Sequence, residues 1–229
     1  VLAVPTPVAG MSRPSISNSE LRTILRSVAV DIGSHKEELR ALDAALGDGD
    51  LGVTIQLAGR AIEEGVREAD GGEADDIGML LARLALSINK ASPSTFGTLL
   101  ASAFLGAAAA VKGKMSLEPA DLLAMGHGAV EGVKKRGKAD VGDKTMLDSL
   151  VPAVEAYGKA LRDGAGAPQA LAAAVDASDK GMQATSAMTA KFGRASWRRE
   201  ESEGVCDAGA AAMHYLILSF CGHASDLVS

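Results

Sequence analysis

Apolar residues recur three and four positions apart along most of the chain, which is the spacing of one face of an α-helix. The clearest stripe runs from Leu21 to Ile32, and Ser17 and Glu20 in front of it have the spacing of a capping box. Further helices are predicted over residues 52–66, 77–88, 95–112, 116–133, 146–162, 168–187 and 213–220. Because no segment alternates as a strand does, the pattern predicts an all-α fold, an antiparallel bundle of about eight helices with short connections.

The helical pattern runs through a single unit. Neither an internal repeat nor an obvious linker divides residues 17–229, which we assign to one domain. Residues 1–16 carry no such stripe, and we expect them to form a flexible N-terminal tail.

Composition agrees with packed helices and narrows the classes of partner. Aromatic residues make up 3% of the chain and alanine is abundant, which favours closely packed helices over a β-sandwich or barrel. The net charge of −6 argues against nucleic acid as a partner, and the longest apolar stretch, residues 99–111, is too short to cross a membrane. Two cysteines, Cys206 and Cys221, provide no disulfide framework, so we expect a reducing, cytoplasmic location.

Four connections between the predicted helices carry more polar chemistry than a turn requires. They are residues 42–54, 90–98, 136–148 and 193–210. In the first, Asp43, Asp48 and Asp50 lie close together in a glycine-rich segment, and such carboxylates repel one another unless a cation lies among them. Since Mg²⁺ prefers hard oxygen ligands, we interpret this connection as a magnesium site, with an acidic turn that caps a helix as the alternative.

The other connections supply groups that bind phosphate. Hydroxyls near predicted helix starts come from Ser92, Ser94, Thr95 and Thr98. Positive charge comes from Lys138, Lys144 and Arg194. Any one of these is ordinarily a solvated surface group. Beside an acidic connection they together indicate phosphoryl transfer, in which catalysis rests on positioning and charge neutralisation.

A set of motifs in a fixed order makes the chain similar to a known family. They are LDAALGDGD at 42–50, FGT at 96–98, RGKADVGDKTMLD at 136–148, GRAS at 193–196 and DAGA at 207–210. Over residues 18–222 the chain resembles the nucleotide-binding L subunit, or Dak2 domain, of dihydroxyacetone kinases. The resemblance implies an eight-helix antiparallel barrel with the nucleotide site in loops at one end. It also implies that Asp43, Asp48 and Asp50 hold two Mg²⁺ ions, which bridge the phosphates of ATP or ADP.

The resemblance assigns further residues to the site. The implied catalytic residues are Asp43, Asp48, Asp50 and Arg194. The implied nucleotide contacts are Leu51, Gly52, Val53, Thr54, Ala91, Ser92, Gly137, Met146, Arg194, Asp207, Ala208 and Gly209. Met146 offers a flexible apolar surface to an adenine, and Arg194 suits charge-assisted hydrogen bonds to phosphate. Residues 195–205 are interpreted as a lid, in which Trp197 is the one large aromatic side chain.

The resemblance also implies a partner. In the family the sugar is bound by a separate K-type subunit or domain, and none of the four histidines of this chain matches the sugar-binding motif. We therefore expect one subunit of a kinase, which transfers a phosphoryl group to dihydroxyacetone, or a similar small ketose, held by a K-type subunit. A homodimer is expected as well.

The sequence leaves alternatives open for the phosphoryl donor and for the role of the chain. GDGDLG at 47–52 is closer to family members that use ATP (GDGDCG) than to those that use a phosphotransferase protein (GDADHG), although Leu51 replaces the usual Cys or His and Ala208 the usual Pro. ATP is thus the expected donor. The alternatives are a phosphotransferase-dependent subunit with ADP as a fixed cofactor, and a regulatory module that acts on a transcription factor. A fatty-acid kinase domain is disfavoured by Leu51 and by the last two motifs.

Overall fold

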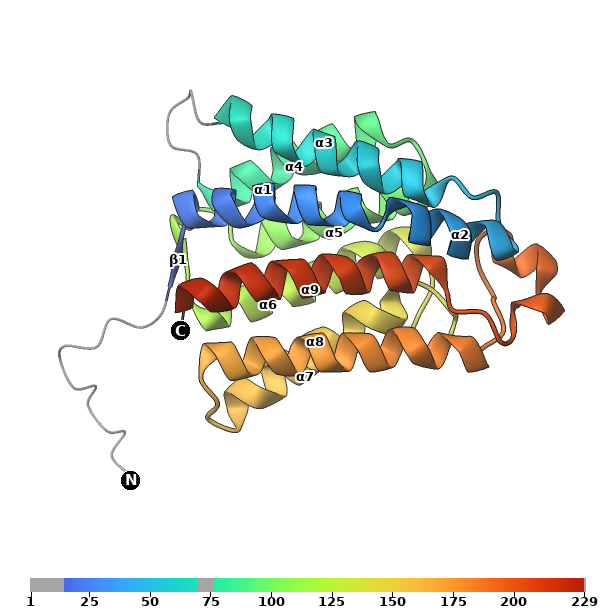
Figure 1. Ribbon diagram of the computed structural model, residues 1–229. Coiled ribbons are helices and arrows are strands. Elements are labelled where there is room, and N and C mark those ends of the chain that lie inside the picture. Colours follow the sequence, from blue (N-terminus) through green and yellow to red (C-terminus); the bar gives the residue numbers. More distant parts are fainter. Residues whose placement is uncertain (1–14, 70–75, 229) are drawn as a thin grey trace.

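The apolar stripes become buried helix faces in the computed structural model, which describes residues 15–69 and 76–228 (Figure 1). The stripe from Leu21 to Ile32 is buried along its length, and so is that from Ile77 to Ile88. The helices of the described residues are α1 (Asn18–Ser34), α2 (Lys36–Leu46), α3 (Leu51–Ala69), α4 (Ile77–Ala91), α5 (Thr95–Ala110), α6 (Pro119–Gly137), α7 (Leu147–Arg162), α8 (Ala167–Ala184) and α9 (Ala208–Val228). Shorter elements are β1 (Ile16–Ser17), β2 (Ser116–Leu117) and the 3₁₀ turns η1 (Thr185–Ala187), η2 (Arg194–Arg198) and η3 (Glu200–Ser202).

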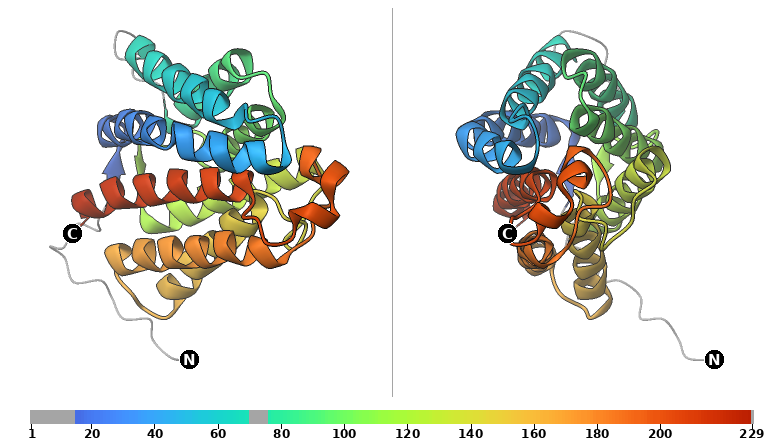
Figure 2. Two further views of the ribbon diagram at one scale, coloured as in Figure 1. Left: turned by 45° about the vertical axis from the view of Figure 1, so that its right-hand side comes forward. Right: turned by 90° about the vertical axis from the view of Figure 1, so that its right-hand side faces the viewer.

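The helices form a closed up-and-down ring. Each long helix packs beside the next along the chain, and α9 closes the ring against α1 (Figure 2). Helix α2 continues α1 after a break at His35, where the backbone has φ −88° and ψ 6°, so the ring has eight rods and confirms the predicted all-α fold. The break follows Gly33 and Ser34, which are weaker helix formers than alanine or leucine.

Small residues let neighbouring helices touch through their backbones. A Cβ atom built on Gly106 of α5 would overlap the carbonyl oxygen of Gly128 on α6, and the reverse holds for Gly128. Gly132 lies against the backbone of Ser102 in the same way. This close contact accounts for the scarcity of large side chains on these faces.

The end of the ring opposite α2 is fastened by a strand pair that the sequence pattern did not predict (Figure 1). Strands β1 and β2 pair antiparallel with Ile16 opposite Leu117, and both side chains are buried. A strand of two residues is too short to show an alternation of apolar and polar positions in the sequence. The predicted tail boundary is therefore wrong for Ile16, while residues 1–14 lie outside the described part of the chain. Ser17 then begins α1 with the predicted capping box, because its Oγ accepts the N–H of Glu20 at 3.3 Å.

The interior of the ring is apolar. It encloses a cavity of about 230 Å³, lined by residues such as Leu25, Phe104, Leu150 and Ile217. Among the described residues, no helix combines the length and apolar character that a membrane crossing requires. The apolar residues thus serve the core, and the polar chemistry gathers at the end of the ring where α2 ends and α3 begins.

Candidate functional site

The starts of four helices meet at one end of the ring. Because the rods alternate in direction, α3, α5, α7 and α9 all begin at this end (Figure 1). Leu51, Thr95, Met146 and Ala208, which lie at these starts, line one cavity of about 250 Å³. The N–H groups of a first helical turn have no partner within the helix, and the helix dipole is positive there. This cavity is therefore suited to an anion such as phosphate.

The three aspartates singled out in the sequence lie together beside this cavity. Asp43 lies in the last turn of α2, while Asp48 and Asp50 lie in the turn before α3, so the connection is shorter than predicted. Gly49 has φ +73°, which reverses the chain between the two exposed aspartates. One carboxylate oxygen of each aspartate lies within 4.8 Å of the others. Such a group of hard oxygen atoms suits a divalent cation of the magnesium type.

The charge balance of this acidic cluster also fits a cation. Burial raises the pKa of Asp43, and the neighbouring charges of Asp50 and Asp48 raise it further, although the N–H of Leu51 donates to its Oδ2 at 3.2 Å. The guanidinium group of Arg194 contacts Asp48 and lies 3.5 Å from Asp50 Oδ2. The cluster thus already attracts Arg194, a cationic side chain from a distant part of the sequence.

A second, wider cavity of about 740 Å³ adjoins the first. It shares Ser94, Met146 and Arg194 with the first cavity and extends to Gly137 at the end of α6. Ser94 caps α5, since its side chain accepts the N–H of Gly97 at 3.0 Å. Met146 is only 2% exposed, so it supports the wall of both cavities and offers a smaller apolar surface than expected. Together the two cavities provide adjoining spaces whose walls carry both polar and apolar groups.

Asp207 forms another part of the wall. Its carboxylate caps α9 by accepting the N–H of Ala210 at 2.7 Å, and its own N–H donates to Thr185 Oγ1 at 2.9 Å. Burial raises the pKa of this carboxyl to about 7, despite the opposing hydrogen bond from Ala210 and the charge of Lys144. Asp207, Ala208 and Gly209 all line the first cavity, as the resemblance implies.

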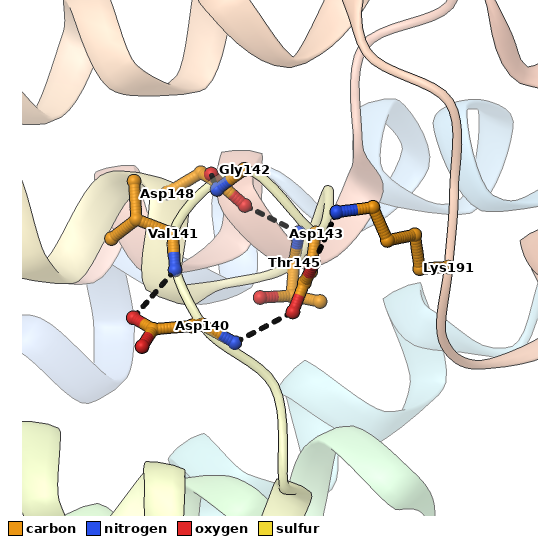
Figure 3. Close-up of polar contacts among 7 residues, drawn as sticks. All are labelled: Asp140, Val141, Gly142, Asp143, Thr145, Asp148 and Lys191. Atoms are coloured by element: carbon orange, nitrogen blue, oxygen red, sulfur yellow. Dashed lines mark hydrogen bonds and ion pairs between the residues drawn. The ribbon is translucent and has the colours of Figure 1, made fainter.

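Hydrogen bonds and an ion pair hold the connection between α6 and α7 in place (Figure 3). The buried carboxylate of Asp148 accepts the N–H of Gly142 at 2.6 Å and that of Thr145 at 2.7 Å. The N–H of Asp140 donates to Asp143 Oδ2 at 2.8 Å, and Lys191 Nζ lies 2.7 Å from Asp143 Oδ1. These bonds fix a connection without regular secondary structure, so that it forms a stable cavity wall.

Other residues implied by the resemblance support the site from outside the cavities. Gly52, Val53, Thr54, Ala91 and Ser92 line neither of the two. A Cβ atom on Gly52 would overlap the carbonyl oxygen of Lys36, so this glycine permits α3 to pack on α2. The buried Ser92 hydroxyl donates to the carbonyl oxygen of Thr54 at 3.3 Å and joins the start of α3 to the end of α4. Direct contact of these residues with a nucleotide stays a prediction.

Three side chains differ from the sequence-based expectation. Lys144 was expected to offer positive charge to phosphate, but it is buried and its ammonium group donates to backbone carbonyls of residues 185–205. Phe192 lines both cavities and was not singled out, although it directly precedes the GRAS motif. Lys138 caps α6 in a left-handed conformation and is exposed outside both cavities, which leaves Arg194 as the predicted cation that reaches the cluster.

Comparison with known proteins identifies the family of the chain. The sequence profile of the DAK2 domain matches residues 45–222. The chain is 30% identical over 203 residues to the ADP-binding subunit DhaL of the PEP-dependent dihydroxyacetone kinase of Escherichia coli, a match that covers 89% of this chain and 95% of that protein. It is 35% identical over 196 residues to human triokinase/FMN cyclase, which covers 86% of this chain and 33% of that longer protein.

A solved structure shares the fold. The crystal structure of the dihydroxyacetone kinase from C. freundii in complex with AMP-PNP and Mg²⁺ superimposes with a TM-score of 0.69 at 23% identity, over 97% of this chain and 37% of that one. The ring of helices is therefore an established architecture. The profile match and the similarity to DhaL show that the chain belongs to the DAK2 domain family.

Proposed function

We propose that the chain is the nucleotide-binding subunit of a dihydroxyacetone kinase, a phosphotransferase with an alcohol acceptor. The observation that carries this proposal is the position of three clustered aspartates beside four helix starts. Carboxylates bind magnesium, and helix starts bind phosphate, so the two halves of a magnesium nucleotide complex find matching groups in adjacent positions. The E. coli relative, which the match covers almost completely, is named as an ADP-binding subunit.

Asp43, Asp48 and Asp50 are the residues that would hold magnesium. Two ions are proposed on the resemblance to the family, and phosphate oxygens would complete their coordination. The metal would supply neutralisation of phosphate charge, which is the main requirement of phosphoryl transfer. The N–H of Leu51 binds Asp43 at 3.2 Å and so fixes the start of α3 relative to the acidic cluster.

Arg194 is proposed to bind the phosphate groups by charge-assisted hydrogen bonds. Its guanidinium group lies between the acidic cluster and the first cavity, where it now bonds to Asp48 and Asp50. A phosphate in the cavity would take over these hydrogen bonds. The base and ribose are proposed to occupy the wider cavity, whose wall includes the apolar side chains of Leu99 and Phe192.

A K-type subunit that binds the ketose is the proposed partner. The segment that carries Arg194 also carries Trp197, whose side chain is 83% exposed beside the site. A large exposed aromatic residue at the mouth of a site is typical of a surface that a partner covers. We propose that the K-type subunit contacts this end of the ring and receives the phosphoryl group there.

The aspartate motif and the E. coli relative point to different phosphoryl donors. The aspartate motif at 47–50 favours ATP, whereas the E. coli relative is a subunit of a PEP-dependent kinase. If a phosphoprotein is the donor, ADP remains bound as a cofactor and should be found by mass spectrometry in the purified chain. If ATP is the donor, the purified chain should exchange added nucleotide readily. It should convert ATP to ADP, with transfer of the γ-phosphoryl group to a ketose hydroxyl, only when the K-type subunit and ketose are present.

Calorimetric titration of the chain with ADP and Mg²⁺ tests the proposed function. Asp48→Asn and Asp50→Asn should each weaken magnesium-dependent ADP binding by about tenfold or more, because each removes a charged metal ligand. Asp176→Asn is the matched control, since Asp176 is an exposed aspartate paired with Lys180 on α8. Equal ADP affinity for all three variants would refute the assignment of the cluster.

A further inference from the structure

Lys144 occupies an unusual position in the connection between α6 and α7. It is 1% exposed, and among the described lysines and arginines it is the buried one. Its backbone has φ +62°, a conformation that residues other than glycine rarely adopt. This backbone turn directs the side chain inward, so the residue requires an explanation beyond surface charge.

The ammonium group of Lys144 lies in a cage of backbone carbonyls. It donates to Thr185 O at 2.6 Å, Met188 O at 3.1 Å, Ser202 O at 2.8 Å and Val205 O at 2.6 Å. An ammonium group has three hydrogens, so the four surrounding acceptors satisfy all of its donors, although burial still lowers the pKa of Lys144. The carbonyls come from both ends of the segment 185–205, which connects α8 to α9.

Two further bonds join the same two ends. The N–H of Gly204 donates to Ser186 O at 2.7 Å, and the N–H of Ala190 donates to the buried Ser202 Oγ at 2.9 Å. The tip between these ends, residues 191–201, is mostly exposed and contains η2 and part of η3. Arg194 extends from the tip to Asp48, and Arg198 donates to the carbonyl oxygen of Ala45 at 3.0 Å. The ends are thus fixed, and the tip crosses the acidic cluster.

We propose that Lys144 is a positioning residue, whose ammonium group clamps the two ends of the segment 185–205 and thereby holds Arg194 and Trp197 over the site. The role of Arg194 toward phosphate rests on the proposed function, but the clamp itself does not. Lys144 therefore acts through the segment. It lines the first cavity, but its ammonium group is directed to the carbonyls of residues 185–205 and not to the phosphate expected from the sequence.

Lys144→Gly tests the clamp with little added backbone strain, because glycine accepts a positive φ. Lys138→Gly is a matched control on the same connection: Lys138 also has a positive φ, +58°, but is exposed. Trypsin cleavage after Arg194, Arg198 and Arg199, followed by mass spectrometry, should be about tenfold faster in Lys144→Gly and change little in Lys138→Gly. Equal rates in the two variants would overturn the proposal.

Chemical rescue separates the clamp from a general loss of stability. Methylammonium supplies a cation with N–H donors that fits an emptied carbonyl cage, whereas tetramethylammonium supplies the charge without donors. Methylammonium should restore slow cleavage in Lys144→Gly, and tetramethylammonium should not. Rescue by both salts, or by neither, would contradict a hydrogen-bonded clamp.

Two measurements complete the test. If Lys144→Gly does not fold, hydrogen exchange of the wild-type chain gives the answer: amides of residues 185–190 and 202–205 should be protected at least about tenfold more than those of 193–200, and equal exchange would overturn the clamp. The emission of Trp197, the single tryptophan, should respond to magnesium ADP in the wild type and lose that response in Lys144→Gly. If the wild type does not bind ADP, the proposed function fails, while the cleavage and rescue results still decide the clamp.

Discussion

Replacement of Asp207 by asparagine should stabilise the fold in a pH-dependent manner. Burial raises the pKa of this carboxyl from 3.8 to about 7. In the unfolded chain the carboxyl ionises near pH 4, whereas in the folded chain it keeps its proton until about pH 7. Between these values the folded state binds more protons than the unfolded state, so the contribution of Asp207 to stability falls as the pH rises.

The size of the effect follows from the difference between the two pKa values. At about 1.4 kcal/mol per pKa unit, the upper limit is roughly 4 kcal/mol above pH 7. The true value should be smaller, about 2 kcal/mol, because the unfolded chain and partial exposure both reduce such differences. Asparagine stays neutral at all these pH values, and its side-chain oxygen can still accept the N–H of Ala210 that caps α9.

Urea unfolding monitored by circular dichroism between pH 4.5 and pH 8 measures this prediction. The advantage of Asp207→Asn over the wild type should be smallest at the acidic end and largest at the basic end. Asp176→Asn, which changes an exposed aspartate on α8, should show no such divergence. A constant difference between Asp207→Asn and the wild type over the whole range would refute the reasoning.

Further predictions concern packing, the lid and assembly. Gly106→Ala should destabilise the fold by about 2 kcal/mol, because its Cβ meets the backbone of Gly128, whereas Gly222→Ala, with open space around it, should stabilise α9 by about 0.5 kcal/mol; urea unfolding measures both. Saturation with magnesium ADP should change the emission of Trp197, and an unchanged spectrum would argue against a lid over the site. Sedimentation velocity should show a homodimer, and a monomer at all concentrations would contradict that expectation.

Much of the fold could be predicted because burial of one helix face leaves a local signal. The stripe from Leu21 to Ile32 shows its period within two turns of sequence, and so do the other long helices. Closure of the ring through α1 and α9 left no such signal, since it depends on contacts between opposite ends of the chain. Helix α2 was also missed: the predicted stripe ended at Ile32, and α2 has only two buried residues, Leu39 and Leu46, which are too few to show a helical period.

In the site, too, contacts between residues near in sequence could be predicted, and contacts between residues far apart in sequence could not. Asp43, Asp48 and Asp50 are near one another in sequence, so their clustering could be predicted. The burial of Lys144 could not, because its hydrogen-bond acceptors lie 41 to 61 residues further along the chain. The hydrogen bond between the Ser92 hydroxyl and the carbonyl oxygen of Thr54 could not be predicted either, because 38 residues separate the two.

The most direct test of the central claim is the location of the metal and the nucleotide in crystals grown with ADP and Mn²⁺. Manganese takes the oxygen ligands of magnesium and is located by its anomalous scattering. The account predicts anomalous peaks among Asp43, Asp48 and Asp50, with the phosphates of ADP next to the starts of α3 and α9 and within reach of Arg194. Manganese elsewhere, or ADP bound away from this end of the ring, would contradict it.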